Sequence, residues 1–151
     1  GCRAPLRELH PPDAEMMITF ESNPEMIFPS SVLASELDNP FNLIAQWGFG
    51  SARGHPVLKL AIDRIVEIEP FFRDKVFANP KAALLMMSAT GLFTDVVRRY
   101  IANHGSSGIT QAGVDFYGQG IFRLPGARIL MGKNHYSRVN NKPVVVSKGK
   151  K

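Results

Sequence analysis

The sequence predicts an α/β fold in a single domain. Apolar residues recur at helical spacing after Pro56, and they do so again over residues 92–103. Short apolar runs with β-prone members, such as Met16–Phe20, lie between turn residues and indicate strands. The chain of 151 residues has the length of one domain, and helices that alternate with strand-like segments are typical of α/β proteins.

Composition narrows the class of protein. Hydrophobic residues make up 44% and charged residues 21% of the chain, which is ordinary for a globular protein, and no apolar run approaches the roughly 20 residues of a membrane span. The single cysteine, Cys2, excludes an internal disulfide and a cysteine-rich zinc site. The net charge of +5 is partly carried by a basic tail over residues 142–151, which we interpret as a solvated end. The other charges are mixed in sign, so we expect no nucleic-acid partner.

The first predicted strand, Met16–Phe20, is a short apolar run with β-prone members and follows a proline-rich loop over residues 5–13. Glu21 ends this strand, where it either faces a ligand or is solvated. Residues 24–42 predict a long loop with one helical turn over residues 32–37, and a loop of this length is often functional, for example as a lid.

Residues 46–58 form the stretch around which the chain is organised. An apolar segment over residues 41–49, interpreted as a strand or extended segment, leads into a turn at Gly54. Pro56 then begins a helix that is predicted to end before Pro70, because proline interrupts a helix interior. His55 at the helix start is either an N-cap or an anion contact. The apolar face of this helix is predicted to comprise Leu58, Ala61, Ile62, Ile65, Val66 and Ile68.

Further elements follow toward the C-terminus. A helical turn is predicted over residues 71–77, and residues 81–88 are either a helix or a buried strand. A second amphipathic helix is predicted over residues 92–103, with Asp95 in its first turn, Arg98 and Arg99 later, and Gly105 as its C-terminal cap. Residues 105–120 predict a loop, and residues 121–124 and 128–131 predict two short strands.

The residues alone identify no reaction. The sequence has no phosphate-binding loop of the Walker type, no GxGxxG, no HExxH and no nucleophile elbow, and its four histidines are dispersed. Thr90 and Gly91 precede the second helix, where their hydroxyl and backbone N–H groups could contact a ligand. These residue types are equally explained by the start of a helix that has no binding role. The polar run Asn134-His135-Tyr136 is a further candidate.

The chain nevertheless resembles glycosyltransferase family 32, which includes the initiation-specific α-1,6-mannosyltransferases. The resemblance covers residues 3–104 and is weak beyond them, where the family's Gly-Ser-Trp after its histidine segment is absent. Leu92 also stands where the family has a proline. The matching segments follow in order: Pro5-Leu6, Glu21, Gln46-Trp47, Gly54-His55-Pro56 and Ala89-Thr90-Gly91-Leu92-Phe93-Thr94-Asp95.

The resemblance implies a GT-A-like nucleotide-sugar transferase fold. It also implies transfer of a hexose, of the mannose or galactose type, from a nucleotide sugar to a glycan or glycolipid acceptor. Eukaryotic members are lumenal proteins of the Golgi membrane with an N-terminal anchor, and bacterial members are cytoplasmic or membrane-peripheral. We therefore expect contact with a membrane only through an anchor before residue 1.

The family's cofactor is a divalent metal, here Mn²⁺, held by a DXD motif that neutralises the diphosphate leaving group. This sequence has no Asp-x-Asp, and the motif would fall a few residues before Gly1. Residues 1–151 are therefore expected to be a partial glycosyltransferase domain, incomplete at its N-terminus and inactive alone. The alternative is a non-catalytic carbohydrate-binding or interaction domain of the same fold.

The resemblance assigns substrate contacts but identifies no catalytic residue. His135 is implied as a metal or diphosphate contact. Trp47 either stacks on a sugar or fills the core. The implied substrate-binding residues are Glu21, Gln46, Trp47, His55, Thr90, Gly91 and Asp95.

Overall fold

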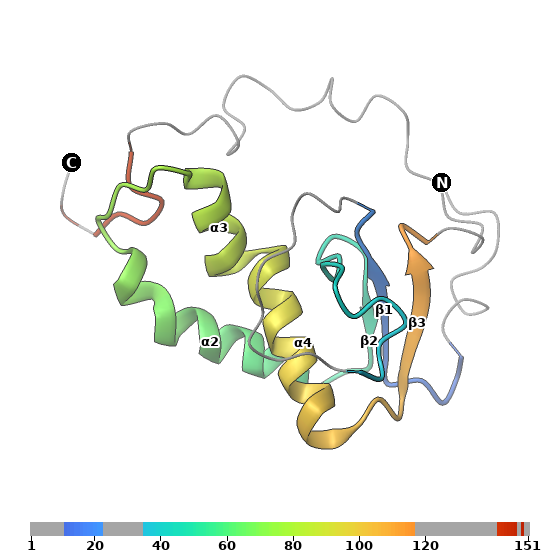
Figure 1. Ribbon diagram of the computed structural model, residues 1–151. Coiled ribbons are helices and arrows are strands. Elements are labelled where there is room, and N and C mark those ends of the chain that lie inside the picture. Colours follow the sequence, from blue (N-terminus) through green and yellow to red (C-terminus); the bar gives the residue numbers. More distant parts are fainter. Residues whose placement is uncertain (1–10, 23–34, 117–141, 148, 150–151) are drawn as a thin grey trace.

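The computed structural model describes residues 11–22, 35–116, 142–147 and 149. Within them a small sheet lies beside three helices, so the predicted α/β class agrees with the architecture (Figure 1). The sheet order is β2–β1–β3, with β1 antiparallel to β2 and parallel to β3. The strands are β1 (Met16–Phe20), β2 (Gly50–Ser51) and β3 (Ile109–Val114).

The central strand, β1, has the predicted bounds, and all five of its residues are buried. Met16, Ile18 and Phe20 face the helices, and Met17 packs on the other face of the sheet against Ala112 and Phe116. Because both faces of β1 are covered, its sequence does not alternate between apolar and exposed polar residues, and its one polar side chain, Thr19, is buried and hydrogen-bonded.

The prediction of a loop over residues 105–120 was wrong, because β3 lies within it. Gly108 (φ +78°), directly before β3, and Gly113 (φ +66°), within it, have left-handed backbone conformations. The pairing of β3 with β1 is irregular between Ile18 and Phe20. These glycines and the polar Gln111 interrupt the apolar pattern by which a strand is predicted from sequence. The segment 41–49 pairs with β1 through a bridge between Ile44 and Phe20, and the two-residue β2 follows it.

Helix α2 (Pro56–Phe72) begins where predicted but continues past Pro70, so the predicted end was wrong. Pro70 lies two residues from the helix end, where its missing N–H removes one hydrogen bond, to the Val66 carbonyl. Arg73 closes the last turn, since its N–H donates to the Glu69 carbonyl over 3.0 Å. A separate helical turn over residues 71–77 is also absent from the described chain, because Asp74 has a left-handed backbone at φ +57°.

The next two helices are α3 (Pro80–Ser88) and α4 (Thr90–His104). Residues 81–88, for which helix and strand were both open, form a helix because Asn79 caps it, its side chain accepting from the Ala82 N–H over 3.0 Å. The second predicted helix is confirmed, but it begins two residues earlier, so Asp95 lies in its second turn and not, as predicted, in the first. Gly105 (φ +81°) ends it, and its N–H donates to the Ile101 carbonyl over 2.7 Å.

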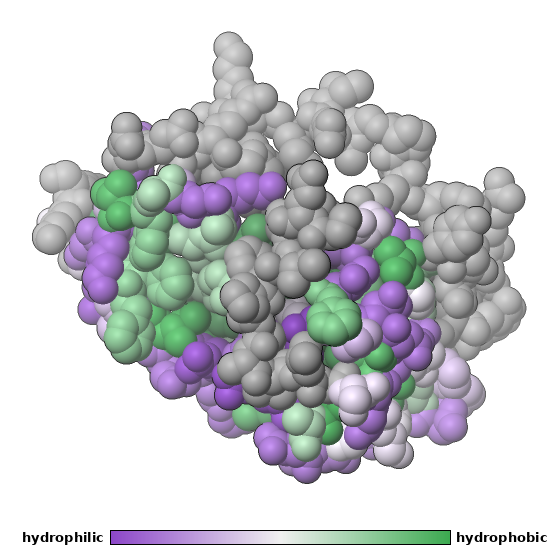
Figure 2. All heavy atoms as spheres, in the orientation of Figure 1, coloured by the Kyte–Doolittle hydropathy of each residue, from purple (hydrophilic) through white to green (hydrophobic). Residues whose placement is uncertain are grey.

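The predicted apolar face of α2 lies partly at the surface, which Figure 2 shows as green areas over the region of α2 and α3. Leu58, Ala61, Ile65 and Ile68 pack against the core. The other two predicted residues do not, since Ile62 and Val66 are 62% and 68% exposed. The apolar stripe of α2 is therefore wider than the surface that α3 and α4 cover.

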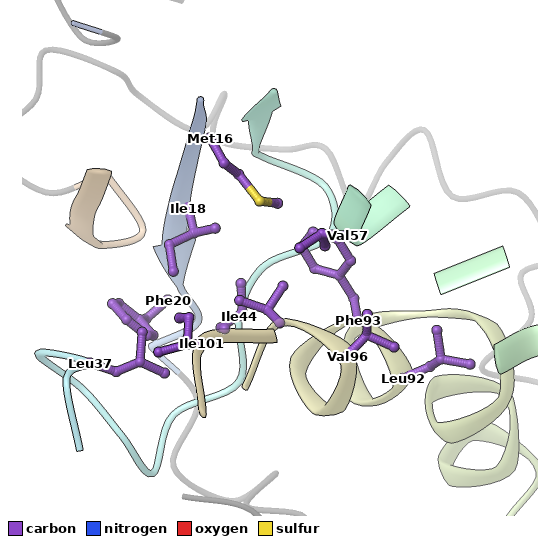
Figure 3. Close-up of a cluster of buried hydrophobic side chains, with 11 residues drawn as sticks. Met16, Ile18, Phe20, Leu37, Ile44, Val57, Leu92, Phe93, Val96 and Ile101 are labelled. Carbon is purple, nitrogen blue, oxygen red and sulfur yellow. The ribbon is translucent and has the colours of Figure 1, made fainter. Parts of the chain in front are cut away.

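The core lies between β1 and α4 (Figure 3). Helix α4 contributes the largest share from one helix, namely Leu92, Phe93, Val96, Val97 and Ile101. Leu37, Ile44 and Val57 complete the cluster. Among the described residues, no helix is both long and apolar enough to cross a membrane. The predicted strands over 121–124 and 128–131, and His135, lie outside the described residues.

Candidate functional site

The carboxyl ends of β1 and β3 lie at the same edge of the sheet, because these strands are parallel. Glu21 follows β1 at this edge, and Thr90 is the first residue of α4. The Thr90 hydroxyl Oγ1 donates a hydrogen bond to Glu21 Oε1 over 3.1 Å. In Figure 1 the N-terminus of α4 lies on the side toward which β1 and β3 point. The structure therefore brings two of the predicted site residues into direct contact.

Asp115, which follows β3, was not predicted from the sequence. Its carboxylate accepts a hydrogen bond from the Ser22 hydroxyl over 2.5 Å, and its N–H donates to the Phe20 carbonyl over 2.7 Å. Asp115 and Phe116 both have left-handed backbones, at φ +50° and +57°. Such conformations cost energy in non-glycine residues and are held by their surroundings, often at functional sites. We define Glu21, Ser22, Thr90 and Asp115 as the carboxyl-edge site.

Three buried polar residues of α4 hold this edge in place. They lie four residues apart, at Thr90, Thr94 and Arg98, and so share one face of the helix. Thr94 Oγ1 accepts from the Ile44 N–H over 2.8 Å, and an Arg98 guanidinium N–H donates to the Asn42 carbonyl over 3.0 Å. The Asn42 amide in turn donates to the Glu21 carbonyl over 3.1 Å.

Two positive groups lie near the Glu21 carboxylate. The N-terminus of a helix carries a partial positive charge, and Glu21 lies against the first residue of α4. Arg98 adds a second positive group behind the Asn42 loop. It is 2% exposed, and burial lowers the pKa of its guanidinium, an effect that Asp95 opposes.

Gly91 and Asp95 do not face Glu21. A Cβ on Gly91 would lie 2.8 Å from Met86 Sδ and 3.0 Å from the Leu85 carbonyl oxygen, so this glycine lets α4 begin directly against α3. The Asp95 carboxylate accepts from Arg99 Nε over 2.9 Å. Asp95 lines a groove of about 390 Å³ between the helices, together with Arg64, Ile68, Phe71, Phe72, Met86 and Leu92.

His55 lies at the other end of α4, near Tyr100, with ring centroids 5.4 Å apart. Ten residues of helix, or about 15 Å, separate Tyr100 from Thr90. The prediction of an N-cap is confirmed, since His55 Nδ1 accepts from the Val57 N–H over 3.3 Å and its carbonyl accepts from Leu58. Because His55 itself accepts from these first N–H groups, the anion contact has no support here.

The environment of His55 keeps the ring neutral. Its side chain is buried, and desolvation lowers the pKa of the imidazole below 6.5, although the charge of Glu15 partly opposes this shift. A neutral ring that accepts at Nδ1 carries its proton on Nε2, and among the described residues this buried atom has no hydrogen-bond partner.

Gln46 and Trp47 lie at the surface. Trp47 is 44% exposed, so it is not a core residue, and its ring packs edge-on against Phe116 with centroids 6.0 Å apart. Gly48 permits this packing, because a Cβ there would lie 2.5 Å from the Phe116 ring. Part of the indole ring is exposed beside Phe116, on this side of the sheet.

The metal implied by the resemblance has no ligand set here. His135 lies outside the described residues. In the part of the chain that the structure describes, no three or more His, Cys, Asp or Glu side chains lie together where they could hold a metal ion. The described residues thus do not fit Mn²⁺.

No protein-family model, no curated protein and no solved structure matches the chain.

Proposed function

We propose that the chain binds the hexose of a nucleotide sugar, and serves hexosyl transfer to a glycan or glycolipid acceptor, through the carboxyl-edge site of a GT-A-like fold. The observation that carries the proposal is the hydrogen bond between Thr90 and Glu21, which joins a carboxylate and a hydroxyl at the edge where parallel strands end. Ligands of α/β sheets bind outside this edge. The resemblance to glycosyltransferase family 32 supports the reaction class.

The chemistry of the site suits sugar hydroxyls. Glu21 and Asp115 supply carboxylate acceptors, and Ser22 and Thr90 supply hydroxyls that both donate and accept. Sugar hydroxyls present both functions at short spacing. Hydrogen bonds to charged groups are the stronger ones, so the two carboxylates are expected to provide most of the discrimination.

The same groups disfavour a diphosphate at this position. Glu21 already occupies the positive end of α4, and a second anion beside it would be repelled. We therefore assign the sugar, and not the diphosphate, to the carboxyl-edge site.

A second candidate is a carbohydrate-binding domain that performs no transfer. An upstream sequence without an acidic metal-binding pair would favour it. The two candidates share the sugar site and differ in whether a sugar–phosphate bond is broken.

Calorimetric titration of the full chain with GDP-mannose, UDP-galactose and the free hexoses tests the proposal. Glu21→Gln removes the charge but keeps the shape, and we expect it to weaken hexose binding about tenfold or more. Asp95→Asn is the matched control, because Asp95 is on another face of α4, and it should leave the affinity unchanged. The sugar site would be refuted by equal losses in both variants, or by no binding of any of these ligands.

Turnover separates the two candidates. Release of nucleoside diphosphate from a donor that the chain binds, in the presence of Mn²⁺ and an acceptor, would support the transferase. Hexose binding that depends on Glu21, without such release, would support the binding domain.

A further inference from the structure

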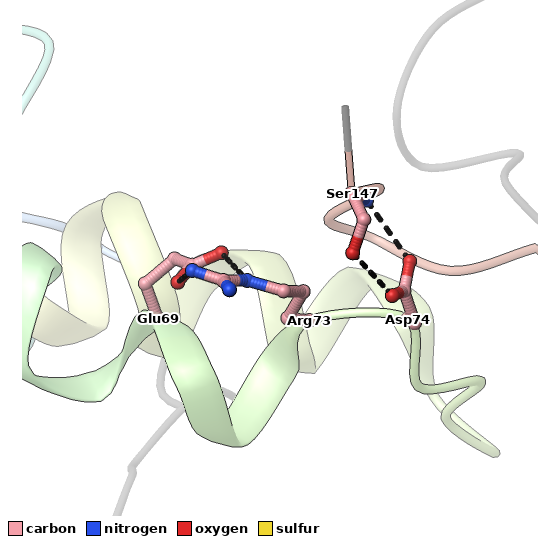
Figure 4. Close-up of polar contacts among 4 residues, drawn as sticks. All are labelled: Glu69, Arg73, Asp74 and Ser147. Carbon is pink, nitrogen blue, oxygen red and sulfur yellow. Dashed lines mark hydrogen bonds and ion pairs between the residues drawn. The ribbon is translucent and has the colours of Figure 1, made fainter. Parts of the chain in front are cut away.

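The end of α2 is hydrogen-bonded to residues 145 and 147, and Figure 4 shows the bonds from Ser147. Arg73 forms a parallel bridge with Val145, and the Asp74 N–H donates to the Val145 carbonyl over 2.9 Å. Ser147 donates to the Asp74 carboxylate from its N–H over 3.0 Å and from its hydroxyl over 2.5 Å. We define residues 71–76 and 142–147 as the α2 tip.

Three large apolar side chains protrude from the α2 tip. Phe71, Val76 and Val146 are 67%, 58% and 56% exposed. Each lies within two residues of Arg73, Asp74 or Val145, so the pairing gathers them at one end of the molecule. One exposed apolar residue is unremarkable, whereas several in one place indicate an interaction surface.

Phe71 connects these protruding side chains to the groove between the helices. It lines that groove of about 390 Å³ with Ile68, Phe72, Met86 and Leu92. The charged groups at the groove are paired, Arg64 with Glu67 and Asp95 with Arg99. Figure 2 shows the corresponding green area over α2 and α3. The apolar surface thus extends inward from the tip.

The charge around the tip is positive. Lys75, Lys81 and Lys142 are exposed, and none of the ion pairs among the described residues involves them. The nearby carboxylates do not outweigh these lysines, since Glu69 pairs with Arg73, and Asp74, which accepts from Ser147, adds a single negative charge. The hydrogen bond from Arg73 also lowers the pKa of Glu69. The sequence adds Lys148, Lys150 and Lys151 directly after the tip.

We propose that the α2 tip docks on an anionic phospholipid surface, where Phe71, Val76 and Val146 insert among the headgroups and the lysines face the phosphates. Protruding apolar side chains beside lysines are complementary to such a surface, which is negative outside and apolar beneath. A nucleic acid would be complementary to the lysines but not to the apolar side chains. The proposal goes beyond hexosyl transfer and does not depend on it. It departs from the expectation that the chain contacts a membrane only through an anchor before residue 1.

Co-sedimentation of the full chain with vesicles tests this surface. We expect binding to vesicles that contain phosphatidylglycerol, little binding to phosphatidylcholine alone, and weaker binding as salt increases. Each of Lys75→Glu and Lys142→Glu should weaken binding about fivefold or more. Phe71→Ser should weaken binding about tenfold, because serine lacks the apolar area that phenylalanine transfers from water into the membrane.

Matched controls distinguish binding through the α2 tip from nonspecific electrostatic or hydrophobic adsorption to the vesicles. Lys59→Glu makes the same change at the other end of α2, where Lys59 is also exposed, and Phe41→Ser removes a phenylalanine that is 59% exposed elsewhere. Both should retain binding, and thermal melting should show every variant folded. Losses in the controls equal to those at the tip would overturn the proposal. Failure to bind anionic vesicles would also overturn the proposal. So would binding of duplex DNA that is as strong as vesicle binding and is unchanged by Phe71→Ser.

Discussion

Thr94 joins α4 to the segment beside β1 through a buried hydroxyl. Its Oγ1 accepts from the Ile44 N–H over 2.8 Å and donates to the Thr90 carbonyl over 2.6 Å. Ile44 is fully buried, so among the described groups this hydroxyl is what satisfies its N–H. The position of Thr90, and with it the contact to Glu21, depends on this connection.

Thr94→Val should therefore destabilise the protein by about 1–3 kcal/mol, because the Ile44 N–H would stay buried without an acceptor. Urea unfolding followed by circular dichroism measures the change. Thr94→Ser keeps the hydroxyl and loses one methyl group, so it should cost about 1 kcal/mol or less. Equal losses in both variants would show that packing, and not the hydrogen bond, is responsible.

Gly91→Ala should cost about 1–3 kcal/mol, because the new Cβ would meet Met86 Sδ and the Leu85 carbonyl oxygen. A double-mutant cycle with Met86→Ala tests this reason. Shortening Met86 should recover part of the loss, and the remainder should persist because the Leu85 backbone cannot move away. A Gly91→Ala protein of unchanged stability would show that α4 and α3 are less closely packed at this point.

Stability should fall with acid through His55. Protonation removes the Nδ1 acceptor that caps α2, and burial holds the pKa of His55 below its ordinary 6.5. The unfolded chain then binds the proton more readily. The contribution of His55 is thus fully present above pH 6.5, and it is lost as the pH falls from 6.5 through the lower pKa of the folded state.

The unfolding free energy of the wild type and of His55→Asn, measured from pH 8 to pH 4, isolates this effect. Asparagine caps helices well and does not titrate in this range. The difference between the two proteins should shrink or reverse in favour of the variant as the pH falls. Parallel curves would exclude His55 as the titrating group.

Pro70→Ala should stabilise α2 by about 1–3 kcal/mol, since alanine supplies an N–H to the Val66 carbonyl and removes a steric clash. The greater freedom of the unfolded chain offsets less than about 1 kcal/mol of this gain. Pro80→Ala is the matched control at the first position of α3, where a missing N–H costs nothing. No difference between the two substitutions would contradict this account of Pro70.

Local signals in the sequence are sufficient for several elements. The short apolar, β-prone run predicts β1, Pro56 and His55 predict the start of α2, and Gly105 predicts the end of α4. Each signal acts within a few residues of the feature that it determines, through backbone conformation, capping or burial. Glu21 could be selected for the same reason, because it directly follows an evident strand.

Tertiary structure decided the rest. Strand β3 exists because it pairs with β1, more than 90 residues earlier in the chain, and its own residues carry little strand pattern. That pairing brings Asp115 to the edge beside Ser22, and the face of α4 selects Thr90 over Asp95 as the partner of Glu21. Elements whose stability is local could be predicted from the sequence. Which predicted residues share a site depended on contacts between distant segments, and no local pattern records those contacts.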